Sequence, residues 1–91
     1  MEVARWIVSY DISDHRDRTA VAHRLHALGP RLLYSTFEIA LREPDLRLLI
    51  RRLAGEIRGA ASMHGIRTCS RCELTAAGTP IEAGQLVVVA R

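Results

Sequence analysis

The chain has 91 residues, a formal net charge of +3 and 48% hydrophobic residues, which is typical of one folded domain (1–91) and excludes a disordered tail. No stretch reaches the roughly 20 apolar residues that a membrane span needs, and the N-terminus lacks the pattern of a signal peptide. Because the chain has only two cysteines, we expect a cytoplasmic protein with no membrane association and no disulfide framework.

The cationic side chains other than histidine are all arginine, thirteen in number, and no lysine is present. The planar guanidinium group binds phosphate through two hydrogen bonds, so a surface of arginines suits a polyanionic partner. Codon bias in a GC-rich genome would also remove lysine. The charge therefore leaves nucleic acid as a candidate partner without requiring it.

Residues 3–10 alternate between two sets of side chains, as expected of a strand. Asp14 is expected to cap a following helix, with Asp17 at the N3 position to complete a capping box. Gly29 and Pro30 are expected to end this helix. Its apolar residues recur with helical spacing and predict one buried face: Val21, Leu25 and Leu28.

Residues 31–41 (RLLYSTFEIAL) favour strand structure. They predict one bent strand or two short strands divided near Ser35 and Thr36, where no turn-forming residue decides between them. Pro44 suits the first turn of a second helix, which Gly59 is expected to end. The apolar stripe of this helix is predicted to contain Leu46, Leu49, Ile50, Leu53 and Ile57.

Residues 66–74 predict a further strand, and residues 76–84 have the composition of a loop. Residues 86–90 predict a final strand that is apolar on both faces and must be covered or paired. This order predicts an α+β, ferredoxin-like βαββαβ fold with an extra C-terminal strand and two helices on one face of an antiparallel sheet. Such a fold hosts many functions, so only the site can indicate one.

Tyr10 and Asp11 stand at the end of the first strand, and two interpretations of Asp11 remain open. In the first, the carboxylate stops the strand, as aspartate often does; in the second, it binds Mg²⁺, which needs only one or two protein carboxylates. In the second case a two-fold axis would bring two copies together, and the ion would activate water for phosphodiester cleavage. Arg16, Arg18 and Arg31 follow as phosphate anchors or as ordinary solvated arginines.

Cys69 and Cys72 form a CxxC motif, with His64 upstream. A closed zinc site needs four ligands, so the pair is either structural or incidental, or it is part of a zinc site shared across a dimer. An apolar aromatic in a strand is usually buried, so we expect Phe37 in the core. The remaining histidines are expected at the surface: His15, His23 and His26.

Residues 10–14 (YDISD), Arg18 and residues 34–38 (YSTFE) occur with an order and spacing that resemble the small CRISPR-associated adaptation protein, the Cas-two family. The resemblance implies a ferredoxin-like homodimer whose two sheets face each other. It also implies that strand 86–90 pairs with the partner subunit. Asp11 matches the family's Mg²⁺ ligand, one from each subunit, and the other positions associated with nuclease activity match Tyr10, Arg18, Arg31 and Phe37.

The resemblance implies two roles, a metal-dependent endonuclease on RNA or double-stranded DNA and a central dimer that joins integrase dimers of the Cas-one family. The second role needs duplex DNA binding without cleavage, so a non-catalytic adaptor is one alternative. A toxin-like ribonuclease of a related ferredoxin-like group is another. The arginines expected to contact nucleic acid are Arg16, Arg18, Arg31, Arg47, Arg51 and Arg52.

Overall fold

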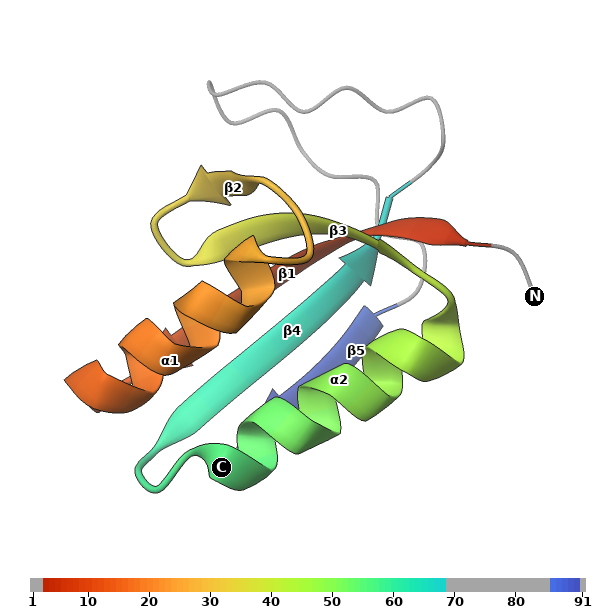
Figure 1. Cartoon of the computed structure of the whole chain (residues 1–91). Helices are drawn as coiled ribbons and strands as arrows, with labels where there is room; N and C mark the ends of the chain where they lie inside the picture. The colour runs from red at the N-terminus through yellow and green to blue at the C-terminus, as the bar shows by residue number, and fades with distance from the viewer. Residues whose placement is uncertain (1–2, 69–85, 91) are drawn as a thin grey trace.

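The computed structural model describes residues 3–68 and 86–90. Its elements are β1 (Ala4–Ile12), α1 (His15–His26), β2 (Arg31–Leu33), β3 (Thr36–Leu41), α2 (Glu43–Glu56), β4 (Ala61–Arg67) and β5 (Leu86–Ala90) (Figure 1). The strands form one sheet in the order β2-β3-β1-β4-β5, and every neighbouring pair is antiparallel. The predicted ferredoxin-like α+β fold is confirmed, with β5 as the extra strand beside β4.

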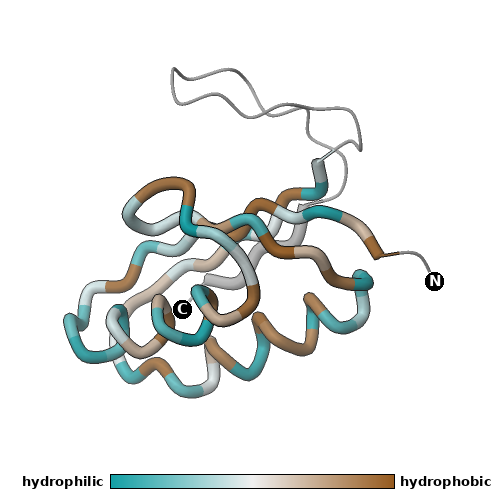
Figure 2. Tube along the Cα trace, turned by 45° about the horizontal axis from the view of Figure 1, so that its top comes forward, coloured by the Kyte–Doolittle hydropathy of each residue, from teal (hydrophilic) through white to brown (hydrophobic). Residues whose placement is uncertain are grey.

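Both helices cover the same face of the sheet (Figure 1), because the alternation of β1 sends one set of apolar side chains to that side. These side chains are all buried: Trp6, Val8, Tyr10 and Ile12. Polar and apolar residues alternate along α1 and α2 (Figure 2). The core is completed by Ile57, which follows α2, and by the apolar residues of the helices: Val21, Leu25, Leu46, Ile50 and Leu53. None of the described helices is long and apolar enough to span a membrane.

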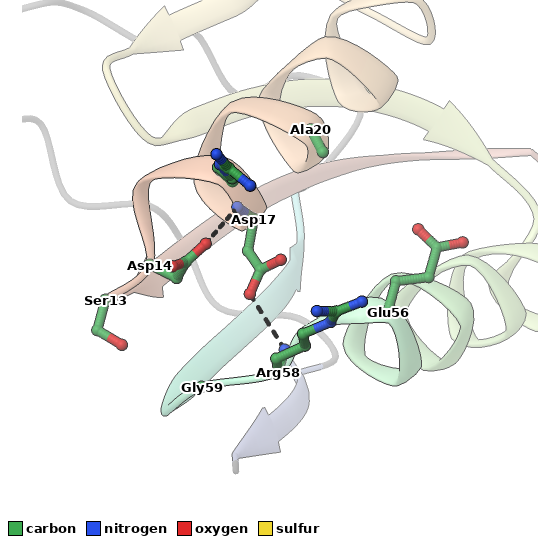
Figure 3. Close-up of a pocket in the computed structure, with 8 residues that line it drawn as sticks. Ser13, Asp14, Asp17, Ala20, Glu56, Arg58 and Gly59 are labelled. Atoms are coloured by element: carbon green, nitrogen blue, oxygen red, sulfur yellow. Dashed lines mark hydrogen bonds between the residues drawn. The ribbon is translucent and has the colours of Figure 1, made fainter.

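The predicted N-cap of α1 is confirmed, because the Asp14 carboxylate accepts a hydrogen bond from the Asp17 backbone N–H at 2.9 Å. The predicted capping box is not completed by Asp17. Its carboxylate instead accepts the backbone N–H of Arg58 at 3.1 Å (Figure 3). Asp17 therefore ties the first turn of α1 to the segment between α2 and β4.

The end of α1 differs from the prediction. The helix ends at His26, and Leu28 lies beyond it with a 45% exposed side chain, so the prediction of Leu28 on the buried face is wrong. The reason is the approach of Gly29 to β3: a Cβ atom at Gly29 would lie 1.9 Å from the backbone oxygen of Glu38. The chain leaves the helix early because it must pass this close to the sheet.

Residues 31–41 form two short strands, β2 and β3, with Tyr34 and Ser35 between them, so the second of the two alternatives is confirmed. Helix α2 has Pro44 in its first turn, as predicted, and ends at Glu56, before the predicted Gly59. Its last turn stops because Ile57 has extended backbone angles, φ −85° and ψ 129°, and its side chain is buried in the core.

Strand β4 begins at Ala61, five residues before the predicted start at Ile66. Its residues Ala61 to Gly65 have weak strand propensity, and their pairing with β1 makes them a strand. The predicted residues 69–74, the loop at 76–84 and both cysteines lie outside the described residues.

Strand β5 occurs where it was predicted, and it pairs with β4 of the same chain, from Ser62 opposite Ala90 to Ile66 opposite Leu86. It is the outermost strand of the sheet. Within the described residues no strand pairs with its outer edge, so pairing with a partner subunit stays a prediction.

Candidate nucleic-acid interface and metal site

Asp11 lies on the face of the sheet opposite the two helices, because it alternates with the buried Tyr10 and Ile12 on β1. Its side chain is exposed, and its backbone neighbour on β4 is Ser62. No hydrogen bond or ion pair of Asp11 occurs among residues 3–68. The carboxylate is therefore open to a cation that approaches from the helix-free side.

The donor set at Asp11 fits a hydrated Mg²⁺ ion better than a fully enclosed metal. No cluster of three or more histidine, cysteine or acidic side chains occurs in the described part of the chain. Magnesium prefers oxygen ligands, retains several waters and is often held by one or two carboxylates. Asp11 can supply one of these carboxylates, and a second copy of Asp11 would have to come from another chain.

Arg18 holds the end of β1 against α1. Its Nη1 atom donates to the backbone oxygen of Ile12 at 3.0 Å, and its Nη2 atom lies 3.2 Å from Nδ1 of His15. The residue after Asp11 is thereby fixed to the first helix. The structure thus places Arg18 beside the strand end that carries Asp11, where it positions the backbone and keeps further N–H groups for a ligand.

Tyr10, Phe37 and Arg31 lie together on the helix side of the sheet. The Tyr10 and Phe37 rings are stacked at 6.4 Å between centroids, and the guanidinium carbon of Arg31 lies 5.2 Å from the centre of the Phe37 ring. Phe37 is fully buried, which confirms its predicted place in the core. The stacked rings of Tyr10 and Phe37 lie beneath the Arg31 guanidinium group on the helix side of the sheet. Asp11 faces the opposite side.

Two contacts of this cluster were missed by sequence reasoning. His26, which is exposed as predicted, packs edge to face with Phe37, with 6.5 Å between the two ring centroids. Tyr34 packs on Arg31, whose Nε atom also donates to the Tyr34 backbone oxygen at 3.0 Å. The sequence signal for the second contact is Tyr34, an aromatic residue three positions after Arg31. It lies in the turn between β2 and β3, which no turn-forming residue marks.

The surroundings of the Tyr10 hydroxyl give a prediction about the stability of the fold. The hydroxyl is buried and has no hydrogen-bond partner in the described part of the chain. Removing an unsatisfied polar group avoids its desolvation cost, so Tyr10→Phe is expected to raise the free energy of unfolding by about 1 kcal/mol. Urea denaturation measures this change; a destabilised Tyr10→Phe would mean that the hydroxyl has a partner.

Arg16 lies at a surface hollow between the start of α1 and the end of α2, together with Arg58 (Figure 3). Neither guanidinium group forms an ion pair within residues 3–68. Acidic residues share the hollow, namely Asp14, Asp17 and Glu56. Because these carboxylates oppose an anion, the hollow is a weaker phosphate site than its two arginines alone suggest.

The three predicted arginines of α2 lie on the helix layer, away from the face that carries Asp11. Arg51 and Arg52 are exposed and have no ion-pair partner among the described residues. Arg47 is paired with Glu43, its Nε atom 3.1 Å from the carboxylate. Arg51 and Arg52 can therefore contact a phosphate backbone, but not the phosphate that Asp11 of the same chain would approach.

Comparison with known proteins gives matches of sequence and of structure. A protein-family model described as CRISPR associated protein Cas2 matches residues 4–76. The chain is 30% identical over 70 residues to CRISPR-associated endoribonuclease Cas2 4 of Rhodospirillum rubrum, an alignment that covers 76% of this chain and 56% of that protein. It is 31% identical over 90 residues to CRISPR-associated endoribonuclease Cas2 1 of Chloroflexus aurantiacus, covering 92% of this chain and 97% of that protein.

A solved structure has the same fold. The chain is similar to the crystal structure of a hypothetical protein TT1823 from Thermus thermophilus, with a TM-score of 0.70 and 28% sequence identity. The match covers 88% of this chain and 99% of that chain. The chain thus spans almost the full length of this structure and of the Chloroflexus protein, but only 56% of the length of the Rhodospirillum protein.

Proposed function

Because this chain belongs to the CRISPR-associated protein Cas2 family, we propose that it is the dimeric, duplex-DNA-binding subunit of a spacer-acquisition complex and that it cleaves phosphodiester bonds with Mg²⁺ bound by Asp11. The observation that carries the proposal is the exposed carboxylate of Asp11 at the end of a central strand, on a sheet face without helices. The names of both relatives specify endoribonucleases, which supports RNA as one substrate of this chain.

The proposal includes a homodimer because one chain supplies only one carboxylate at this position. Two copies whose helix-free faces meet across a two-fold axis would bring both Asp11 side chains toward the same ion. This face also carries the ion pair between Arg5 and Glu38 at 3.4 Å, whose side chains are 40% and 24% exposed. These partly exposed polar groups can contact a second sheet.

In this mechanism the bound ion supplies charge neutralisation at the phosphate and a water of lowered pKa. Asp11 holds the ion, and Arg18 fixes the strand end on which Asp11 stands. Arg31 lies on the edge strand β2, on the helix side of the sheet, where its N–H groups can bind a phosphate other than the one that Asp11 approaches. Tyr10 and Phe37 keep Arg31 in place through the buried aromatic stack.

The non-catalytic adaptor is the second candidate, and one observation favours it. Arg51 and Arg52 are exposed on α2 and form no ion pair with an acidic side chain of residues 3–68, so a duplex can contact them independently of Asp11. Contacts from arginine to the backbone bind duplex DNA without regard to sequence. A dimer that binds DNA in this way and also binds an integrase of the Cas-one family needs no cleavage. Cleavage assays of Asp11 variants separate the two candidates.

The salt dependence of duplex binding tests the arginines of α2. Each phosphate contact contributes about 0.9 to the slope of log K against log salt concentration. The double substitution Arg51→Gln with Arg52→Gln, in both subunits, is expected to weaken duplex binding and to reduce this slope by about 2 or more. Fluorescence anisotropy of a labelled duplex at several salt concentrations measures it.

The matched control for this experiment is Arg42→Gln, because Arg42 is already paired with Asp45 at 2.8 Å. This control should leave the slope close to that of the wild type. An unchanged slope in the double variant would show that Arg51 and Arg52 do not contact the DNA.

A toxin-like ribonuclease would show a third pattern, with cleavage of RNA and no measurable affinity for duplex DNA.

A further inference from the structure

Tyr34 is an exposed aromatic side chain at the turn between β2 and β3. Its side chain is 70% exposed, and the neighbouring Leu32 and Leu33 are 39% and 64% exposed. Leu32 and Leu33 belong to β2, which forms one edge of the sheet. This arrangement places a large ring at the surface without burying it against the core.

The Tyr34 ring is held in position from the inside. The guanidinium carbon of Arg31 lies 5.3 Å from the centre of the Tyr34 ring and 5.2 Å from that of the buried Phe37. Phe37 is in turn stacked with Tyr10. An aromatic and cationic column therefore runs from the core to the surface and ends in the Tyr34 ring, whose remaining face is open to solvent.

The chemistry of this column matches an unpaired nucleobase. A base offers a flat π surface that stacks on an aromatic ring, and its phosphate brings negative charge toward the arginine. An apolar protein surface would match the ring and the leucines, but it would have to desolvate the Arg31 guanidinium, which has no ion-pair partner in the described part of the chain. The charge of Arg31 thus favours nucleic acid over an apolar protein partner.

We propose that Tyr34 is a stacking platform for an unpaired base of single-stranded RNA or DNA, with Arg31 contacting the adjacent phosphate. The proposal rests on the proposed nucleic-acid function and adds a residue that stacks on an unpaired base, in a single strand or at the unpaired end of a duplex. A base inside a duplex is already stacked on both sides, so a blunt duplex cannot use this platform.

The test is binding of short single strands that carry the fluorescent base 2-aminopurine, in RNA and DNA forms, compared with a blunt duplex of the same sequence. Stacking on an aromatic ring quenches this fluorescence. Tyr34→Leu removes the π face and keeps an apolar side chain, whereas Tyr34→Phe keeps the π face. Leu33→Ala is the control for exposed apolar area on the same edge strand.

Tyr34→Leu is expected to weaken single-strand binding by at least about fivefold and to lose the quenching. Tyr34→Phe and Leu33→Ala should remain within about twofold of the wild type, and blunt-duplex binding should not change in any variant. A loss confined to RNA or to DNA would still support the platform and would assign the strand type.

The platform is refuted if Tyr34→Leu binds single strands and quenches the 2-aminopurine fluorescence as the wild type does. In that case all variants would still show salt-sensitive binding. The proposed function then stands without it. If Tyr34→Leu alters the sedimentation mass but not the quenching, the surface binds protein and the platform is also refuted. If the folded wild type binds no nucleic acid, both the platform and the proposed function fail.

Discussion

An Asp11→Asn variant is expected to keep the fold and to lose Mg²⁺-dependent cleavage by about a hundredfold or more. Asparagine has the same shape as aspartate but cannot supply the negative charge that holds a hydrated Mg²⁺ ion. Loss of the metal removes several kcal/mol of transition-state stabilisation, which corresponds to about a hundredfold in rate at least. The fold should be unaffected, since Asp11 is exposed and makes no hydrogen bond or ion pair within residues 3–68.

The assay uses labelled single-stranded RNA and duplex DNA, with Mg²⁺ and then with chelator, and records thermal unfolding and oligomeric mass in the same samples. Asp45→Asn is a suitable control because it removes an acidic side chain, 42% exposed, from α2 on the other side of the sheet. Equal cleavage by Asp11→Asn and the wild type would show that Asp11 is not the metal ligand. If neither protein cleaves but both bind duplex equally well, the adaptor is the better description.

Gly29→Ala is expected to destabilise the fold by about 3 kcal/mol, because overpacking against an immobile neighbour costs this much. The new Cβ would lie 1.9 Å from the backbone oxygen of Glu38 and 3.0 Å from its carbonyl carbon. Glu38 cannot move aside easily: its N–H donates to the Pro30 oxygen at 3.0 Å, and it is paired with Ile7 of β1. The melting temperature should fall by about 15 °C.

Gly55→Ala is the matched control for this substitution. Gly55 lies in the last turn of α2 and is exposed, and among the described residues an added Cβ would have no atom within 4 Å apart from its chain neighbours and the backbone of its own helix. Alanine has the higher helix propensity, so this variant should gain about 0.5 kcal/mol. Thermal unfolding of both variants by circular dichroism gives the comparison. A Gly29→Ala protein with the melting temperature of the wild type would contradict the close approach of Gly29 to β3.

Much of the fold was predictable because its signals are local. The alternation of β1, the Asp14 cap and Pro44 at the start of α2 depend on a few neighbouring residues, and the sequence predicts each of them correctly. The start of β4 was not predictable in this way. Residues 61–65 become a strand by pairing with β1, a partner about fifty residues away in the chain.

The candidate site divides in the same manner. Asp11, Arg18, Arg31 and Phe37 were identified from their order in the chain, but the order does not specify which of them share a face. The structure brings Arg31 and Phe37 together and leaves Asp11 on the opposite side of the sheet. A single chain thus presents Asp11 on the helix-free face of the sheet. The exposed arginines of α2 lie on the helix layer, which covers the opposite face.

Most helices and strands of this protein therefore follow from the sequence alone. Side-chain alternation, helical periodicity and caps reflect interactions between residues that are close in sequence. The tertiary structure alone decided the link from Asp17 to Arg58, the close passage of Gly29 over β3 and the stacking of Tyr10 on Phe37. Each of these contacts depends on how the helices and strands pack together, so a pattern of neighbouring residues does not contain the energy that creates it.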